Sequence, residues 1–112
     1  MKTAQFTMTG NIGHDVKVNK FENSSKAYFS LAVNETNKDG EKQPTEWFDI
    51  VAWRSNDKAH EFDKLKKGQL VKISGYIKNE KFSDKNGVEQ KKISLIATVW
   101  DTYQKKEDLI ND

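Results

Sequence analysis

The strongest constraint on the fold comes from one short segment, Thr45–Trp53, whose sequence is TEWFDIVAW. The side chains of a β-strand alternate between the two faces of a sheet. One face would therefore carry the residues that can enter a core: Phe48, Ile50 and Ala52. Trp47 and Trp53, six residues apart, would share the other face. The segment predicts a half-buried strand that holds two large aromatic rings away from its core face.

The charge of the chain is nearly balanced overall but uneven along its length. Its 112 residues suit a single domain, and 19 basic against 17 acidic residues leave a formal charge of +2. Between Val71 and Lys92, however, six lysines occur with only three acidic residues. A positive surface that also carries aromatic rings suits unpaired nucleic acid, because bases offer π-faces and the backbone is anionic. This segment is the expected electrostatic footprint.

Several kinds of site are not expected. The chain has no cysteine and only two histidines, which leaves no disulfide, no thiol chemistry and no Cys/His zinc site. His14 and His60 are far apart in sequence, and Glu46 and Asp49 would point to opposite faces of their strand. We therefore expect no catalytic site, metal or cofactor. No apolar run approaches the ~20 residues of a membrane span, so we expect a soluble, intracellular protein.

The remaining patterns predict an all-β domain with one helix. Strand-like runs occur at residues 5–9, 27–34, 47–54, 70–78 and 91–100. A helix capped by Ser55 or Asn56 would lie between the third and fourth strands, with Ala59, Phe62 and Leu65 at helical spacing and Gly68 as its stop. Gly75 favours a bulge, and residues 84–87 favour a projecting hairpin. This order is typical of the five-stranded Greek-key barrel of the oligonucleotide-binding (OB) fold.

Short motifs in a fixed order also point to a family. They are Gly10–Gly13, Phe29–Asn34, Thr45–Trp47, and Lys67-Gly68 followed by Val71 and Gly75. In order and spacing they resemble bacterial single-stranded DNA-binding proteins over residues 4 to 103. The resemblance implies an OB-fold domain at 1–103 that binds single-stranded DNA in replication, recombination and repair. It also implies a homotetramer, in which one strand can wrap several subunits, and a cytoplasmic, nucleoid-associated location.

The same resemblance assigns the expected stacking contacts, while the clustering of positive charge suggests the backbone contacts. Trp47, Trp53 and Phe82 match the base-stacking aromatics of the family. Basic residues are the expected backbone contacts: Arg54, Lys72, Lys78, Lys81, Lys85 and Lys91. Two departures stand out. Residues 34–44 lack a stacking aromatic that some relatives carry, and residues 104–112 form only a short charged tail. That tail is either a reduced version of the acidic tip that recruits replication and repair enzymes or an ordinary terminus.

Plainer interpretations of these residues stay open. The two tryptophans could be buried against a partner subunit or a loop, and Phe82 could fold back on the barrel. Single lysines are most often only solvated, and Arg54 could pair with a nearby acidic residue. Trp100 is better suited to packing or to an interface than to stacking on bases.

Rival functions also remain. The domain could be a primosome-type module that binds protein partners and holds nucleic acid weakly. It could be an accessory domain of an enzyme, such as an anticodon-binding or nuclease-associated barrel. RNA is a further possible ligand, because stacking platforms do not detect a 2′-hydroxyl.

Overall fold

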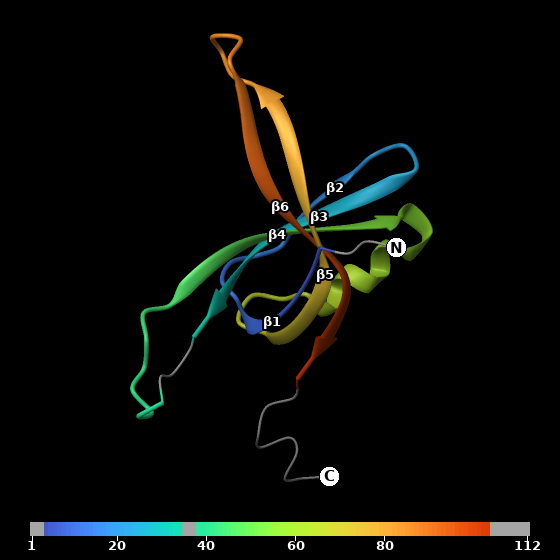
Figure 1. Ribbon diagram of the computed structural model, residues 1–112. Helices are drawn as coiled ribbons and strands as arrows, with labels where there is room; N and C mark the ends of the chain where they lie inside the picture. The colour runs from blue at the N-terminus through green and yellow to red at the C-terminus, as the bar shows by residue number, and fades with distance from the viewer. Residues whose placement is uncertain (1–3, 35–37, 104–112) are drawn as a thin grey trace.

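The computed structural model describes residues 4–34 and 38–103 (Figure 1). Within these ranges it has six strands and one 3₁₀ helix. The strands are β1 (Gln5–Ile12), β2 (Lys17–Lys20), β3 (Ser24–Val33), β4 (Glu46–Ser55), β5 (Leu70–Ser83) and β6 (Glu89–Thr102), and the helix η1 spans Asn56–Lys64. The predicted tail at 104–112 and part of the loop after β3 lie outside the described residues. The expected strands are confirmed, and β2 is an additional short one.

The strands form one closed sheet. Their order is β1-β5-β6-β4-β3-β2, and β1 also pairs with β3 through Asn11 and Ile12. This second pairing joins the two sides of the sheet into a barrel. The β4–β6 pairing is parallel, and the others are antiparallel. The predicted barrel with a helix between its third and fourth long strands is therefore confirmed.

The barrel interior is filled by alternating residues of the long strands, as the alternation in β4 predicts. Ile50 and Ala52 are fully buried. They join a core that also contains Ile12, Ala27, Phe29, Leu31, Phe62, Leu65, Val71, Ile73, Ala97 and Trp100. Trp47 and Trp53, on the other face of β4, stay exposed. Burial of Ile50 and Ala52 fixes the register of β4, because a slip by one residue would turn both side chains outward.

A β-bulge at Gly75 bends the β5–β6 pair. Ser74 lies opposite Val99, but Gly75 lies opposite Ala97, so Thr98 is the extra residue on β6. A Cβ atom at Gly75 would lie 1.8 Å from the Ile96 carbonyl oxygen. Only glycine leaves room for this close approach, and the predicted bulge is confirmed.

The helix is a 3₁₀ helix along its whole length. Ala59, Phe62 and Leu65, spaced three apart, fall on one side of a helix with three residues per turn. Phe62 and Leu65 are buried against the barrel. Ser55 occupies the N-cap position but makes no side-chain capping bond.

The β5–β6 hairpin projects from the barrel, at the top of Figure 1. Its turn is closed by a 3.0 Å hydrogen bond from the Gly87 N–H to the Asp84 carbonyl oxygen, and Gly87 has a φ of 78°. The Asp84 carboxylate accepts bonds from the N–H groups of Asn86 and Val88, both 2.9 Å long. These bonds lower the pKa of Asp84, the bond from Val88 having the largest effect. The hairpin expected from Asn86-Gly87 is confirmed, with the glycine alone in the left-handed conformation.

Candidate nucleic-acid interface

The outer face of β4 carries the two predicted tryptophans. The exposed fraction is 61% for Trp47 and 41% for Trp53. The indole of Trp47 lies against Gly13, where an added Cβ would come within 2.2 Å of the Cζ3 atom of the ring. The glycine therefore makes room for the indole. Both rings are accessible in this chain rather than buried under a loop of it.

Strand β3 extends this face beside β4. Lys26 pairs with Trp53, Tyr28 with Val51, and Ser30 with Asp49. The Nζ atom of Lys26 lies 5.8 Å from the centroid of the Trp53 ring, close enough for a cation–π contact. The sequence alone does not identify Lys26 as a neighbour of Trp53, because that pairing depends on the register of β3 against β4.

Phe21, also missed, lies beside Trp53. The two ring centroids are 5.8 Å apart with planes tilted by 33°, and half of Phe21 is exposed. The turn that carries Phe21 is anchored to the start of the helix. There the Asn56 side-chain amide donates to the carbonyl oxygens of Phe21 and Glu22, at 2.9 and 3.1 Å. The Ser25 hydroxyl in turn donates to the Asn56 side-chain oxygen at 2.6 Å, so the aromatic pair is held in place by polar contacts.

Phe82 lies on the same side of the sheet, far out on the hairpin. Val51 of β4 pairs with Ile96 of β6, and Ile96 pairs with Tyr76 of β5. Alternation along β5 then places Lys78 and Phe82 on that same side. Phe82 is 50% exposed, and its cross-strand partner is Gln90. The structure thus places Phe82 on the projecting arm and the tryptophans on the barrel.

The predicted lysines do not share one surface. Lys78 lies on the Phe82 side of the hairpin, as does Lys92, whereas Lys81 and Lys91 face each other across its opposite side. Two further predicted lysines lie elsewhere: Lys85 in the turn and Lys72 opposite Asp101 at the far end of the β5–β6 pair.

The ion pairs of the hairpin are weak. Lys78 lies 4.0 Å from Glu80, and Lys81 lies 3.5 Å from Glu89. The side chains of both pairs are largely exposed, and such pairs contribute little to stability. Their ammonium groups can exchange a carboxylate for a phosphate at small cost.

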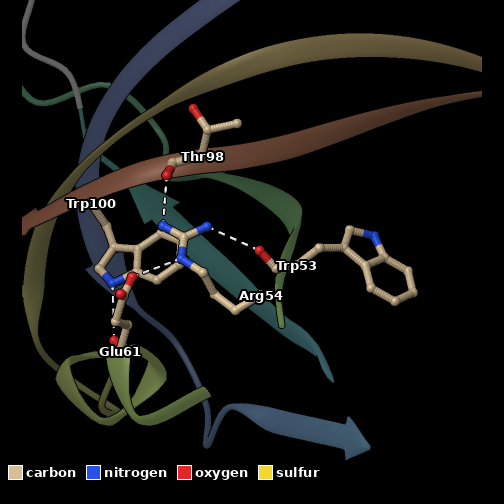
Figure 2. A network of polar contacts seen from close by, with 5 residues as sticks. All are labelled: Trp53, Arg54, Glu61, Thr98 and Trp100. Atoms are coloured by element: carbon tan, nitrogen blue, oxygen red, sulfur yellow. Dashed lines mark hydrogen bonds and ion pairs between the residues drawn. The ribbon is translucent and has the colours of Figure 1, made fainter. Parts of the chain in front are cut away.

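Arg54 lies on the wrong face of β4 for the predicted backbone contact, because it continues the core set of Ile50 and Ala52. Its Nε donates to the Glu61 carboxylate at 2.7 Å, and its Nη2 donates to the Thr98 carbonyl oxygen at 2.7 Å. Figure 2 shows the guanidinium in this network, while the Trp53 indole points away from it. The structure agrees with the alternative in which Arg54 pairs with an acidic residue. Arg54 is therefore not counted among the residues of the candidate interface.

Trp100 belongs to the same structural network. It is buried, and its ring stacks on Phe62 with centroids 5.8 Å apart. Its Nε1 donates to the Glu61 carbonyl oxygen at 3.1 Å, and the Arg54 guanidinium lies 4.1 Å from the ring centroid. The hydrogen bond from Arg54 lowers the pKa of Glu61. Packing is therefore the role that the structure gives to Trp100.

A groove of 340 Å³ opens on the outer face where β4 approaches β6. It is lined by Tyr28, Trp47, Phe48, Asp49, Val51, Lys92, Ile93, Ser94 and Leu95. Burial, together with the charge and hydrogen bond of Asp49, raises the pKa of Tyr28, so its hydroxyl stays protonated. The groove thus combines an aromatic wall, a carboxylate, a phenol and an ammonium group.

The described part of the chain offers no evident metal site, because no three His, Cys, Asp or Glu side chains gather there in a group that could hold a metal ion. No helix within residues 4–34 and 38–103 has the length and apolar character needed to span a membrane.

Comparisons of structure match this fold to known single-stranded DNA-binding proteins. A Plasmodium falciparum SSB, solved in complex with ssDNA, superposes with a TM-score of 0.73 at 20% identity, covering 93% of this chain and 97% of that one. A small single-stranded DNA-binding protein from Streptomyces coelicolor gives a TM-score of 0.67 at 18% identity, covering 92% and 96%. At these identities the likeness concerns the fold, and it confirms the OB-fold prediction.

Comparisons of sequence show the family of the chain as well as its fold. The single-stranded DNA-binding protein of Thermosynechococcus vestitus is 32% identical over 103 residues, which cover 90% of this chain and 82% of that protein. The protein of the same name from Neisseria meningitidis serogroup A is 30% identical over 102 residues, which cover 87% of this chain but only 58% of the relative. Residues 3–103 match the model of the single-strand binding protein family. The chain belongs to the single-strand binding protein family.

Proposed function

We propose that this protein binds single-stranded DNA on the outer face of β3, β4 and the β5–β6 hairpin, and that stacking and charge neutralisation provide the affinity. The observation that carries the proposal is the exposure of Trp47 and Trp53 on one side of a strand whose other side is buried. An exposed indole gives up hydration at little cost when a base stacks on it. Such stacking contributes about 1–3 kcal/mol per base and tolerates any sequence.

The charges next to the rings support the same role. Lys26 lies beside Trp53, and Lys78 and Lys92 lie on the Phe82 side of the hairpin. Phosphates that follow a strand of stacked bases would meet these ammonium groups. Phe21 adds an aromatic surface next to Trp53, and it partly offsets the missing aromatic in the loop after β3.

The biological role follows from this binding mode. A protein that covers bases and backbone without marked sequence preference shields the strand from nucleases and from re-annealing. We place it on this basis in DNA replication, recombination and repair, as a non-enzymatic protein of the cytoplasm. Contacts with replication and repair proteins through residues 104–112 remain a prediction from the sequence.

We also propose self-association into a homotetramer. Between Phe6 and Thr9, β1 pairs only with β5, so one edge of this stretch carries no strand within the described residues. An open strand edge is a template for pairing with a second chain. Exposed Val99, which lies on the outer side of β6 near this strand, adds apolar surface. Sedimentation showing a monomer at micromolar concentration would remove this part of the proposal.

The binding face is tested by alanine variants of its aromatic residues. Trp47→Ala and Trp53→Ala should each weaken binding to an oligothymidine by about 1–3 kcal/mol while the circular dichroism spectrum stays that of the wild type. Val18→Ala, on β2, is the matched control because it also removes an exposed apolar side chain but lies outside the proposed face. If affinity is unchanged when both tryptophans are replaced, the face is wrongly assigned and a protein-binding module becomes the better account.

A further inference from the structure

The groove between β4 and β6 contains a carboxylate where the proposed function calls for positive charge. Asp49 is exposed and lies between Trp47 and Val51 on the outer face of β4. A carboxylate repels phosphates, and it has no proton to donate to them. On a surface that follows a polyanion, Asp49 therefore needs a partner other than the backbone.

The edges of the bases supply such partners. Single-stranded nucleic acids are recognised through bases that stack on aromatic rings and form hydrogen bonds along their Watson–Crick edges. Asp49 is two residues from Trp47 on the same face, about 6.6 Å along the strand. A base stacked on Trp47 can thus turn its edge toward the carboxylate.

We propose that this groove accommodates a guanine, stacked on Trp47 and donating its N1–H and its N2 amino group to the two oxygens of Asp49. This inference rests on the proposed function and adds a local base preference to it. An ionised carboxylate only accepts hydrogen bonds, so it favours an edge that presents two adjacent donors. Guanine has that edge. Cytosine and adenine place an acceptor nitrogen beside their amino group, and thymine places its single N–H between two carbonyl oxygens.

Other residues of the groove fit this ligand. Tyr28 lines the groove beside Asp49, and burial together with the nearby charge of Asp49 raises the pKa of Tyr28, so its hydroxyl stays available as a hydrogen-bond donor. Lys92 lines the groove from β6 and can neutralise the phosphate of the bound nucleotide. Val51 and Leu95 contribute apolar surface to the same groove.

The test compares bases that differ by one amino group. Thymidine oligonucleotides would carry isolated guanine or isolated hypoxanthine, which lacks the N2 amino group but keeps N1–H. The wild-type protein should bind the guanine oligonucleotide about 3- to 10-fold more tightly, the range of one net hydrogen bond to a site open to water. In Asp49→Asn the ratio should fall toward one, because the amide has a single acceptor oxygen for the N1–H that both bases share and places its NH2 donor against the N2 amino group that only guanine has.

Glu46→Gln is the matched control. It removes a carboxylate from the same strand but from its opposite face, so it should leave the ratio of the wild type intact. Tight binding of both oligonucleotides by the wild type with equal affinity would overturn the groove proposal alone. So would an Asp49→Asn variant that gains affinity for both equally, since the carboxylate would then act only as a repelling charge. If the wild type binds neither oligonucleotide, the proposed function itself fails.

Discussion

Replacing Arg54 by methionine separates a structural role from a DNA-binding one. Methionine keeps an unbranched apolar stem but loses the guanidinium. Thr98 is the extra residue of the β6 bulge, and Arg54 provides a hydrogen bond to its carbonyl oxygen at 2.7 Å. Water can replace this bond in part, so we assign about 1 kcal/mol to its loss. The guanidinium over the Trp100 ring contributes about 1 kcal/mol more.

We therefore expect the loss of these two contacts in Arg54→Met to lower the free energy of unfolding by about 2 kcal/mol, to which the partly exposed pair with Glu61 adds a smaller, pH-dependent part. Denaturant unfolding at a fixed protein concentration measures this, because self-association would make stability depend on concentration. Binding to oligothymidine at several salt concentrations is the second assay. A phosphate contact would remove about 0.7 from the slope of log affinity against log salt. The reasoning is refuted if stability is unchanged and the slope falls by that amount.

Three further predictions follow from close contacts in the structure. Gly13→Ala places a methyl group on the Trp47 indole, so oligothymidine affinity should fall by up to about 1–3 kcal/mol and the tryptophan emission should shift; unchanged affinity and emission would show that the ring has room. Gly75→Ala forces a Cβ onto the Ile96 carbonyl and should lower the thermal midpoint by several degrees in calorimetry, whereas a wild-type midpoint would mean that the bulge tolerates a side chain. Arg54 holds the pKa of Glu61 below its ordinary value of 4.5, so this carboxylate stabilises the fold above that pH and loses its effect as the pH falls through the lowered pKa. The stability gap between wild type and Arg54→Met should therefore be widest at neutral pH and shrink in acid, and a gap independent of pH would contradict the pair.

The period-two pattern of β4 determines much of what the sequence could predict. Once Ile50 and Ala52 are assigned to the core, the exposure of Trp47 and Trp53 follows. The same parity places Arg54 on the core side, so the sequence did contain the signal for the alternative in which Arg54 pairs with an acidic residue, here Glu61. The backbone contact stays a prediction, and the bonds of Arg54 to Glu61 and Thr98 argue against it.

Other features depend on which strands pair, and local sequence does not determine that. Lys26 and Phe21 join Trp53 only through the register of β3 on β4 and through the turn that Asn56 anchors. The short strand β2 has four exposed residues with no alternation, so its sequence carries no strand signal. Its strand conformation comes from pairing with β3.

The bulge makes β6 harder to interpret from the sequence than β4. Thr98 shifts the parity of β6, so that Ala97 and Trp100 both face the core although one is odd and the other even. The lysine-rich segment lies before this residue, and there plain alternation decides which side a lysine faces. Lys81 is three residues from Lys78, so it faces the opposite side of the hairpin together with its cross-strand partner Lys91. A count of lysines along the segment takes no account of this alternation.

The most direct test of the central claim is a titration of the intrinsic tryptophan fluorescence with a long oligothymidine and with duplex DNA, each at low and high salt. Bases stacked on Trp47 and Trp53 should quench their emission stoichiometrically with the single strand alone, less strongly at high salt, and leave the emission of buried Trp100. Emission that stays constant with both ligands would contradict the account, because the exposed rings would then not meet the bases.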